Sequence, residues 1–281
     1  MSRDRAALGA FLRACRDRLT PAEAGITAFP GARRVPGLRK EEAALLAGLS
    51  TDHYSRLEQG RQHRVSDDVV NALARALRLS EVEHRHLRDL AAPTARARTG
   101  AWSTPQRPEP GLLRVLAGLD HLPALLLGRR GEVLARNALL VEVLGHDMAP
   151  GTSFPRYLFT DPGARERIVN WSDFAAAAVG GLRLELGTTP DDRLLTALVD
   201  ELRAADPQVA AWWDEQGVAD RASQVKHIAH PLAGALSFHI EAVSLPTAPH
   251  QRLVVYTTEP GSPTARLLPL LSSWGAPAPA P

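Results

Sequence analysis

The chain has 281 residues, of which 44% are hydrophobic and 23% charged, and its formal net charge is +2. This composition is typical of a globular protein with two domains, and no apolar run is long enough to cross a bilayer. The single cysteine, Cys15, excludes an internal disulfide framework and a metal site built from cysteines. Because the N-terminus has no apolar signal segment, we expect a cytoplasmic protein. We also expect no membrane partner, no cofactor and no metal.

The charge is divided unevenly along the chain. Residues 1–98 carry 18 basic and 12 acidic side chains, a net of +6, whereas residues 99–281 carry 15 and 19, a net of −4. A basic first part joined to an acidic remainder suggests that the first part meets a polyanion and the second does not.

Residues 1–92 show the apolar spacing of a compact all-α domain with five helices. Ser66 and Ser80 are placed to cap the last two helices, and the turn at Thr20 ends the first. The five predicted helices cover about Ala6–Leu19, Arg39–Ala47, Thr51–Gln59, Asp67–Leu77 and a segment that starts at Ser80.

The rest of the chain has a different character. Residues 93–111 are rich in proline and predict a linker. Residues 112–274 contain two short predicted strands, a helical middle and three more strands, which favours an α+β domain with an antiparallel sheet. Residues 275–281 contain mainly proline and alanine, and we expect a disordered tail.

The segment from Leu38 to Gly60 has the spacing of a helix-turn-helix. Ala44 is small enough for two helices to cross closely, and Gly48 can adopt the positive φ of the turn between them. Ser50 can cap the second helix. The side chains that then point inward and fix the angle between the helices are Tyr54, Leu57, Leu49 and either Leu45 or Leu46.

This arrangement leaves five side chains facing outward from the N-terminal half of the second helix. In such motifs this half of the helix enters the major groove of DNA. Arg56 is suited to a guanine and Asp52 to a cytosine. The predicted base-reading residues are Thr51, Asp52, His53, Ser55 and Arg56, and the predicted phosphate-contacting residues are Arg39, Lys40, Ser50, Arg61, His63 and Arg64.

At these positions the sequence resembles the Xre/Cro-type helix-turn-helix family of repressors. Ala44, Gly48, Tyr54 and Leu57 meet the spacing of the family, and Glu58 and Gly60 meet its downstream Glu-x-Gly. Lys40 stands where the family usually has a glutamine, which shifts that contact towards charge. The loop from Thr20 to Gly37 is also longer than the family minimum.

A longer resemblance, to the MmyB-like regulators of actinobacteria, covers nearly the whole chain. It is carried by Tyr54-x-Arg56-Leu57-Glu58-Gln59-Gly60, by 157–162, by Trp171, by His230-Pro231 and by 256–262. The resemblance implies a PAS-like ligand-binding fold for residues 112–274, with a cavity between the sheet and the helices and a fatty-acid-like molecule as one known type of occupant.

Large side chains of the second domain are the candidates for lining such a cavity, although packing of an ordinary core is the simpler role for each of them. The candidates are Phe154, Tyr157, Phe159, Trp171, Phe174, Trp212, Phe238 and Tyr256. Residues with the spacing of a nucleophile elbow, a phosphate-binding loop or a metal site are not found, so the sequence does not predict an enzyme.

One short helix reads too few base pairs for selectivity in a genome, so we expect a homodimer on double-stranded DNA with a palindromic operator. The second domain would respond to a small hydrophobic ligand. The alternative is a second domain that serves dimerisation or protein interaction without a small molecule.

Overall fold

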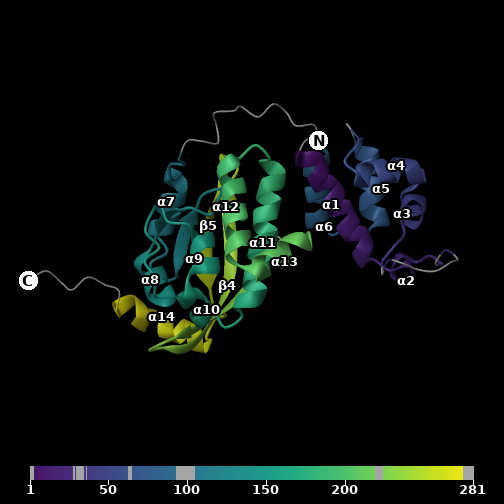
Figure 1. Cartoon of the computed structure of the whole chain (residues 1–281). Coiled ribbons are helices and arrows are strands. Elements are labelled where there is room, and N and C mark those ends of the chain that lie inside the picture. Colours follow the sequence, from purple (N-terminus) through teal and green to yellow (C-terminus); the bar gives the residue numbers. More distant parts are fainter. Residues whose placement is uncertain are drawn as a thin grey trace, which may run out of the picture. The chain divides into compact units, whose positions relative to one another are not determined.

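The computed structural model describes residues 3–27, 29, 35, 37–62, 65–92, 105–218 and 224–274, and the chain forms two compact units. The first unit comprises Met1–Ser103, Arg183–Thr196 and Ala211–Ala219. The second comprises Thr104–Leu182, Ala197–Ala210 and Asp220–Pro281. Figure 1 shows the helices and strands, coloured by their position along the chain.

The described residues up to position 92 contain the five predicted helices and one more. The helices are α1 (Arg3–Arg18), α2 (Pro21–Ala24), α3 (Lys40–Ala47), α4 (Thr51–Glu58), α5 (Asp67–Ala76) and α6 (Glu81–Ala91). The unexpected helix is α2. Thr20 caps it in a reciprocal pair with Glu23, and Pro21 begins its first turn, so the proline that ends α1 also starts the next helix.

These helices enclose one apolar core. Phe11 and Leu12 from α1, Leu38 before α3, and Tyr54 and Leu57 from α4 are fully buried in it. α1 packs against both α4 and α6, and α3 packs against α4 and α5. The core therefore holds α3 and α4 in a fixed arrangement through contacts with residues far away in the sequence.

The second unit is built on a five-stranded antiparallel sheet with the order β2-β1-β5-β4-β3. Its strands are β1 (Ala124–Leu127), β2 (Val133–Arg136), β3 (Gln224–His230), β4 (Gly234–Leu245) and β5 (Ala248–Thr257). The prediction of a helical domain followed by an α+β, PAS-like domain with an antiparallel sheet is confirmed by this architecture.

Helices occupy the rest of the second part of the chain. They are α7 (Pro110–Ala117), α8 (Ala138–Leu144), α9 (Phe154–Thr160), α10 (Pro162–Arg167), α11 (Trp171–Thr188), α12 (Arg193–Ala205), α13 (Pro207–Asp214) and α14 (Pro263–Trp274). Two of these helices, α9 and α14, begin in the same way. Both begin with a serine cap, Ser153 or Ser262, and a proline in the first turn.

The two faces of the sheet have different surroundings. On one face, Leu112 and Leu116 of α7 pack with Ala124, Leu126, Leu253 and Val255. The alternate residues of the same strands, among them Leu125 and Val254, point to the other face. That second face is where the helices α9 and α11 approach the sheet.

Contacts with the sheet begin within the predicted linker, before the predicted start of the second domain at residue 112. The buried Gln251 of β5 donates from Nε2 to the carbonyl of Arg107 and accepts from the backbone N–H of Glu109, at 2.7 and 2.8 Å. Arg107 and Glu109, which belong to the predicted linker, are thereby tied to the sheet just before α7. Positions 93–104 and the predicted tail 275–281 lie outside the described residues.

Candidate functional site

The turn between α3 and α4 has the expected geometry. Gly48 ends α3 with φ of 66°, in the left-handed region that glycine adopts without strain. Two residues later, the Ser50 hydroxyl accepts a hydrogen bond from the His53 backbone N–H at 3.2 Å and begins α4. Glycine and serine thus set where one helix stops and the next begins.

The inner faces of the two helices are closely packed. Ala44 is 1% exposed, and Tyr54 and Leu57 are fully buried. Of the two leucines left open by the sequence, Leu46 packs against the core whereas Leu45 is 61% exposed. This packing leaves one side of α4 facing solvent.

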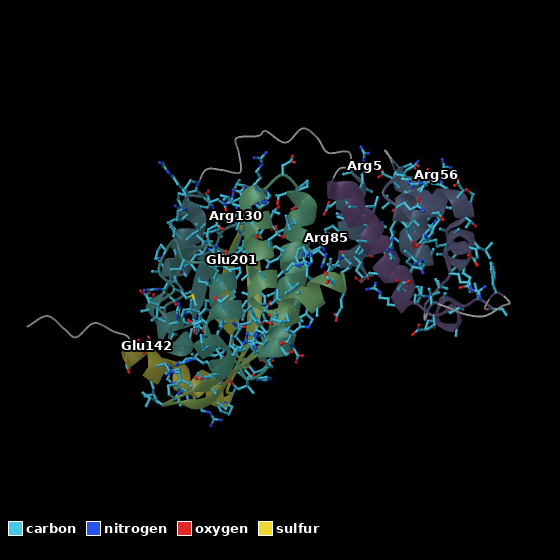
Figure 2. The ribbon with its side chains drawn as sticks, in the orientation of Figure 1. Arg5, Arg56, Arg85, Arg130, Glu142 and Glu201 are labelled. Carbon is cyan, nitrogen blue, oxygen red and sulfur yellow. The ribbon has the colours of Figure 1, made fainter. Side chains whose placement is uncertain are left out.

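We call Thr51, Asp52, His53, Ser55 and Arg56 the reading face of α4. Thr51, Asp52 and Arg56 are exposed, and His53 and Ser55 are half-buried. The carboxylate of Asp52 pairs with the guanidinium of Arg56 one helical turn away. Arg56 lies at the surface of the first unit (Figure 2), where the pair is open to exchange with a partner.

The residues predicted to contact phosphate have different surroundings. The amine of Lys40 lies 3.5 Å from Oε2 of the buried Glu58, and the Arg39 side chain is 18% exposed. The Ser50 hydroxyl is used as a helix cap, although the residue is exposed, and Arg61 is exposed. His63 and Arg64 lie outside the described residues.

Glu58 joins three elements, a role that the sequence motif alone did not reveal. Its side chain is fully buried, and Oε1 accepts from Nε of Arg16 at 2.5 Å. Arg16 also donates to the Leu38 carbonyl at 2.7 Å. The carboxylate therefore ties α4 to α1 and to the approach to α3, and it faces Lys40 as well.

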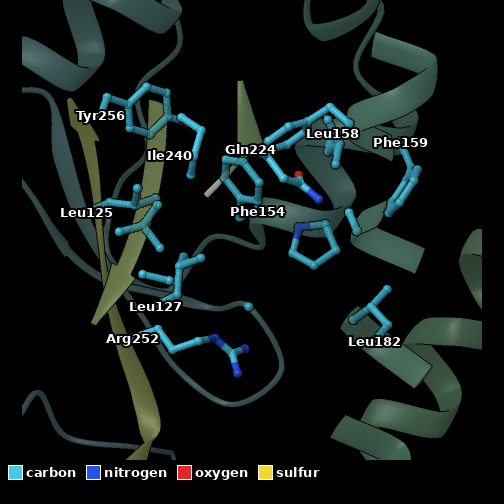
Figure 3. Close-up of a pocket in the computed structure, with 16 residues that line it drawn as sticks. Leu125, Leu127, Phe154, Leu158, Phe159, Leu182, Gln224, Ile240, Arg252 and Tyr256 are labelled. Atoms are coloured by element: carbon cyan, nitrogen blue, oxygen red, sulfur yellow. The ribbon is translucent and has the colours of Figure 1, made fainter. Parts of the chain in front are cut away.

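A cavity with a mostly apolar lining lies within the second unit, between the sheet and the helices. The cavity volume is about 60 Å³. Figure 3 shows Leu125, Leu127 and Tyr256 on the strand side and Leu158, Phe159 and Leu182 on the helix side. Gln224 and Arg252 add polar groups to this lining.

The structure places four of the eight candidate lining residues at this cavity and four elsewhere. Phe154, Phe159, Phe174 and Tyr256 line it. Outside the lining, Trp171 is buried with its indole N–H donating to the Leu158 carbonyl at 2.8 Å, and Tyr157 lies against His146. Phe238 is buried against the ring of Tyr256, and Trp212 belongs to a segment of the first unit.

Sequence reasoning missed Lys226, which lies beside the cavity lining. Its side chain is fully buried, and Nζ donates to the hydroxyl of Tyr256 at 2.8 Å. Nζ is also 3.9 Å from the ring centroid of Phe174 and 5.2 Å from that of Phe154. The signal was the alternation along β3, which puts Lys226 on the same face as the buried Ile228.

The comparisons with known proteins match both units. Residues 7–87 match the model of a helix-turn-helix domain, and residues 108–271 match that of the MmyB-like transcription regulator ligand binding domain. A search of the curated proteins found no significant match. The second match covers more than half of the 281 residues. The chain belongs to the MmyB-like transcription regulators.

The protein is therefore a DNA-binding transcription regulator with a ligand-binding domain. Among its described residues, no helix is long and apolar enough to span a membrane. The same residues contain no cluster of three or more His, Cys, Asp or Glu side chains that suits a metal ion.

Proposed function

We propose that α4 of this MmyB-like regulator reads an operator in the major groove and that a small apolar ligand in the second unit modulates the binding. The observation that carries the proposal is the exposed reading face of α4 on a rigid, fully packed helix pair. A side chain can discriminate between bases only when the helix that carries it is held in a fixed register.

Within the reading face, Arg56 is the residue best placed to specify a base. Its guanidinium is paired with Asp52, whose carboxylate holds the arginine fork in place and is itself an acceptor for cytosine. Thr51, His53 and Ser55 complete the contact. Arg39, Lys40, Ser50, Arg61, His63 and Arg64 form the surrounding phosphate contacts in this proposal.

Selection of binding sites from random DNA, followed by affinity measurements on the selected operator, tests this proposal. Arg56→Ala is expected to cost about 1–3 kcal/mol on the operator and to relax the preference at one base position. The control is Arg114→Ala, which removes an exposed arginine from α7. Unchanged affinity and preference in Arg56→Ala would show that the register of the reading face is wrong.

We further propose that the protein acts as a homodimer on a palindromic operator. Two copies of α4 about one helical turn of DNA apart, roughly 34 Å, would read the two half-sites. Light scattering and the stoichiometry of the complex with operator DNA measure this directly. A single copy bound to a single half-site at full affinity would contradict the dimer.

The proposed ligand site is the cavity lined by Phe154, Phe159, Phe174 and Tyr256. Support comes from its position within the part that matches the ligand-binding family. Ala178 also lines the cavity, so Ala178→Trp is expected to fill it and abolish ligand-induced thermal stabilisation. Ser172→Trp, at an exposed position of the same helix, is the matched control.

The second candidate function is a second unit that mediates protein interaction without a small molecule. Native mass spectrometry of protein purified from its own host separates the two candidates. A bound adduct supports the ligand site. A bare chain, together with no thermal stabilisation across a panel of lipids and metabolites, supports the interaction module.

A further inference from the structure

The amine of Lys226 is buried behind three rings that line an apolar cavity, and Lys226 itself is not part of the lining. Phe154, Phe174 and Tyr256 all line the cavity, and the same three rings surround Nζ, with centroid distances of 5.2, 3.9 and 4.9 Å. Gln224, two residues earlier on the same strand, lines the cavity as well. A molecule in the cavity would therefore share its aromatic walls with the lysine.

The surroundings of Lys226 are unusual for a cation. Within the part of the chain that the structure describes, no carboxylate pairs with its amine, which donates a hydrogen bond to Tyr256. A buried ammonium without a counter-charge is costly. Burial accordingly lowers the pKa of the Lys226 amine to about 7, so near neutral pH a large share of the side chain is a free amine.

The residue type at position 226 is uncommon in this chain. Of the 33 basic residues in the chain, Lys40 and Lys226 are the two lysines, and the other 31 are arginine. Arginine is the better partner for a carboxylate or phosphate, but it cannot lose its proton and act as a nucleophile. Lysine at this buried position is what amine chemistry requires, rather than what recognition of an anion requires.

We propose that the cavity takes a small apolar aldehyde and that the Lys226 nitrogen binds it covalently as an imine. The proposal rests on the proposed ligand site and deepens it by naming the chemical class of the ligand. Lysine amines desolvated in apolar pockets are the nucleophiles that form such adducts with carbonyl compounds.

The reaction needs no oxidant or reductant. The lone pair of Nζ adds to the aldehyde carbon, and a proton moves from nitrogen to the former carbonyl oxygen to give a carbinolamine. Loss of that hydroxyl with the second nitrogen proton releases one water and leaves the C=N bond. The adduct reverses when water adds to the same carbon.

Tyr256 is placed to move the proton in this reaction. Its hydroxyl is 2.8 Å from Nζ, and burial raises its pKa, so that it stays protonated. The hydroxyl can protonate the leaving oxygen and recover a proton from nitrogen in the same encounter. Tyr256 is therefore the proton-transfer group of the proposed site.

The test treats the full chain with octanal, traps the imine with sodium cyanoborohydride, and locates the octyl group by intact mass and peptide mapping. The chain simplifies the readout because Lys40 and the N-terminus are its other primary amines. We expect one octyl group on Lys226, retained in Lys40→Arg and lost in Lys226→Met. Tyr256→Phe is expected to slow trapping on the order of a hundredfold.

The controls separate this inference from the proposed ligand site. Urea should abolish the preference for Lys226 over Lys40, and Ala178→Trp should abolish labelling of Lys226 in the folded chain. Labelling of Lys226 no faster than Lys40 would overturn the imine. Thermal stabilisation by octanol without any adduct would overturn the imine and leave the ligand site standing. Stabilisation by octanoate that exceeds the effect of octanal and is lost in Lys226→Met would instead show an anion site.

Discussion

Glu58 shows how one side chain gives a sequence motif its rigidity. Its fully buried carboxylate receives Nε of Arg16 at 2.5 Å and faces Lys40 at 3.5 Å. We expect Glu58→Gln to destabilise the helical part of the first unit by about 3–5 kcal/mol, because two cations lose their buried counter-charge. Hydrogen exchange of peptides from α1 and α4 measures this, with Glu41→Gln, a more exposed carboxylate on α3, as the control. Unchanged protection would mean that the buried pair is dispensable.

Lys226 should make the stability of the protein depend on pH. Its pKa is lowered by burial from 10.5 to about 7. Between these values the unfolded chain binds a proton that the folded chain does not, so the free energy of unfolding rises with pH by up to about 1.4 kcal/mol per unit. At pH values below this window the Lys226 amine is protonated in both the folded and the unfolded state. The free-energy cost of burying its charge is then fully present.

We therefore expect Lys226→Met to remove this rise and to stabilise the protein most on the acidic side of the window. Urea unfolding followed by tryptophan fluorescence, from about pH 6 to pH 9, measures the effect. All five tryptophans lie beyond residue 98, so the signal reports the second part of the chain. Parallel pH profiles of the two proteins would show that the amine has its ordinary pKa.

Helices α1 and α4 cross closely at Gly9. A Cβ at Gly9 of α1 would lie 2.2 Å from the carbonyl oxygen of Glu58, so the two helices can cross this closely only with glycine here. Alanine ordinarily stabilises a helix relative to glycine. We expect the opposite sign for Gly9→Ala, a loss of about 1–3 kcal/mol from overpacking. Thermal unfolding measures it, against Arg13→Ala at an exposed position of the same helix.

The helix-turn-helix could be predicted from the sequence because the residues that specify it are close together along the chain. Gly48, Ser50, Tyr54 and Leu57 predict the helix-turn-helix because turn, cap and buried positions lie within a few residues of one another. Arg16 and Glu58 are 42 residues apart, so their pairing depends on how α1 crosses α4 and leaves no local pattern. Half of the candidate cavity residues lie elsewhere for a similar reason: an aromatic side chain signals burial and does not say which space it borders.

For the whole molecule, the testable property is coupling between DNA and ligand. If a ligand in the second unit changes the affinity for the operator by a given factor, the operator must change the affinity for the ligand by the same factor. Typical couplings correspond to factors of about 5–150. We expect this reciprocity in titrations of operator DNA with and without ligand, and of ligand with and without DNA. Ala178→Trp should reduce both factors to one without altering binding of DNA alone, since the reading face of α4 and the cavity share no residues. A protein in which ligand binds tightly but both factors equal one would have two independent activities on one chain and would not be a ligand-controlled regulator.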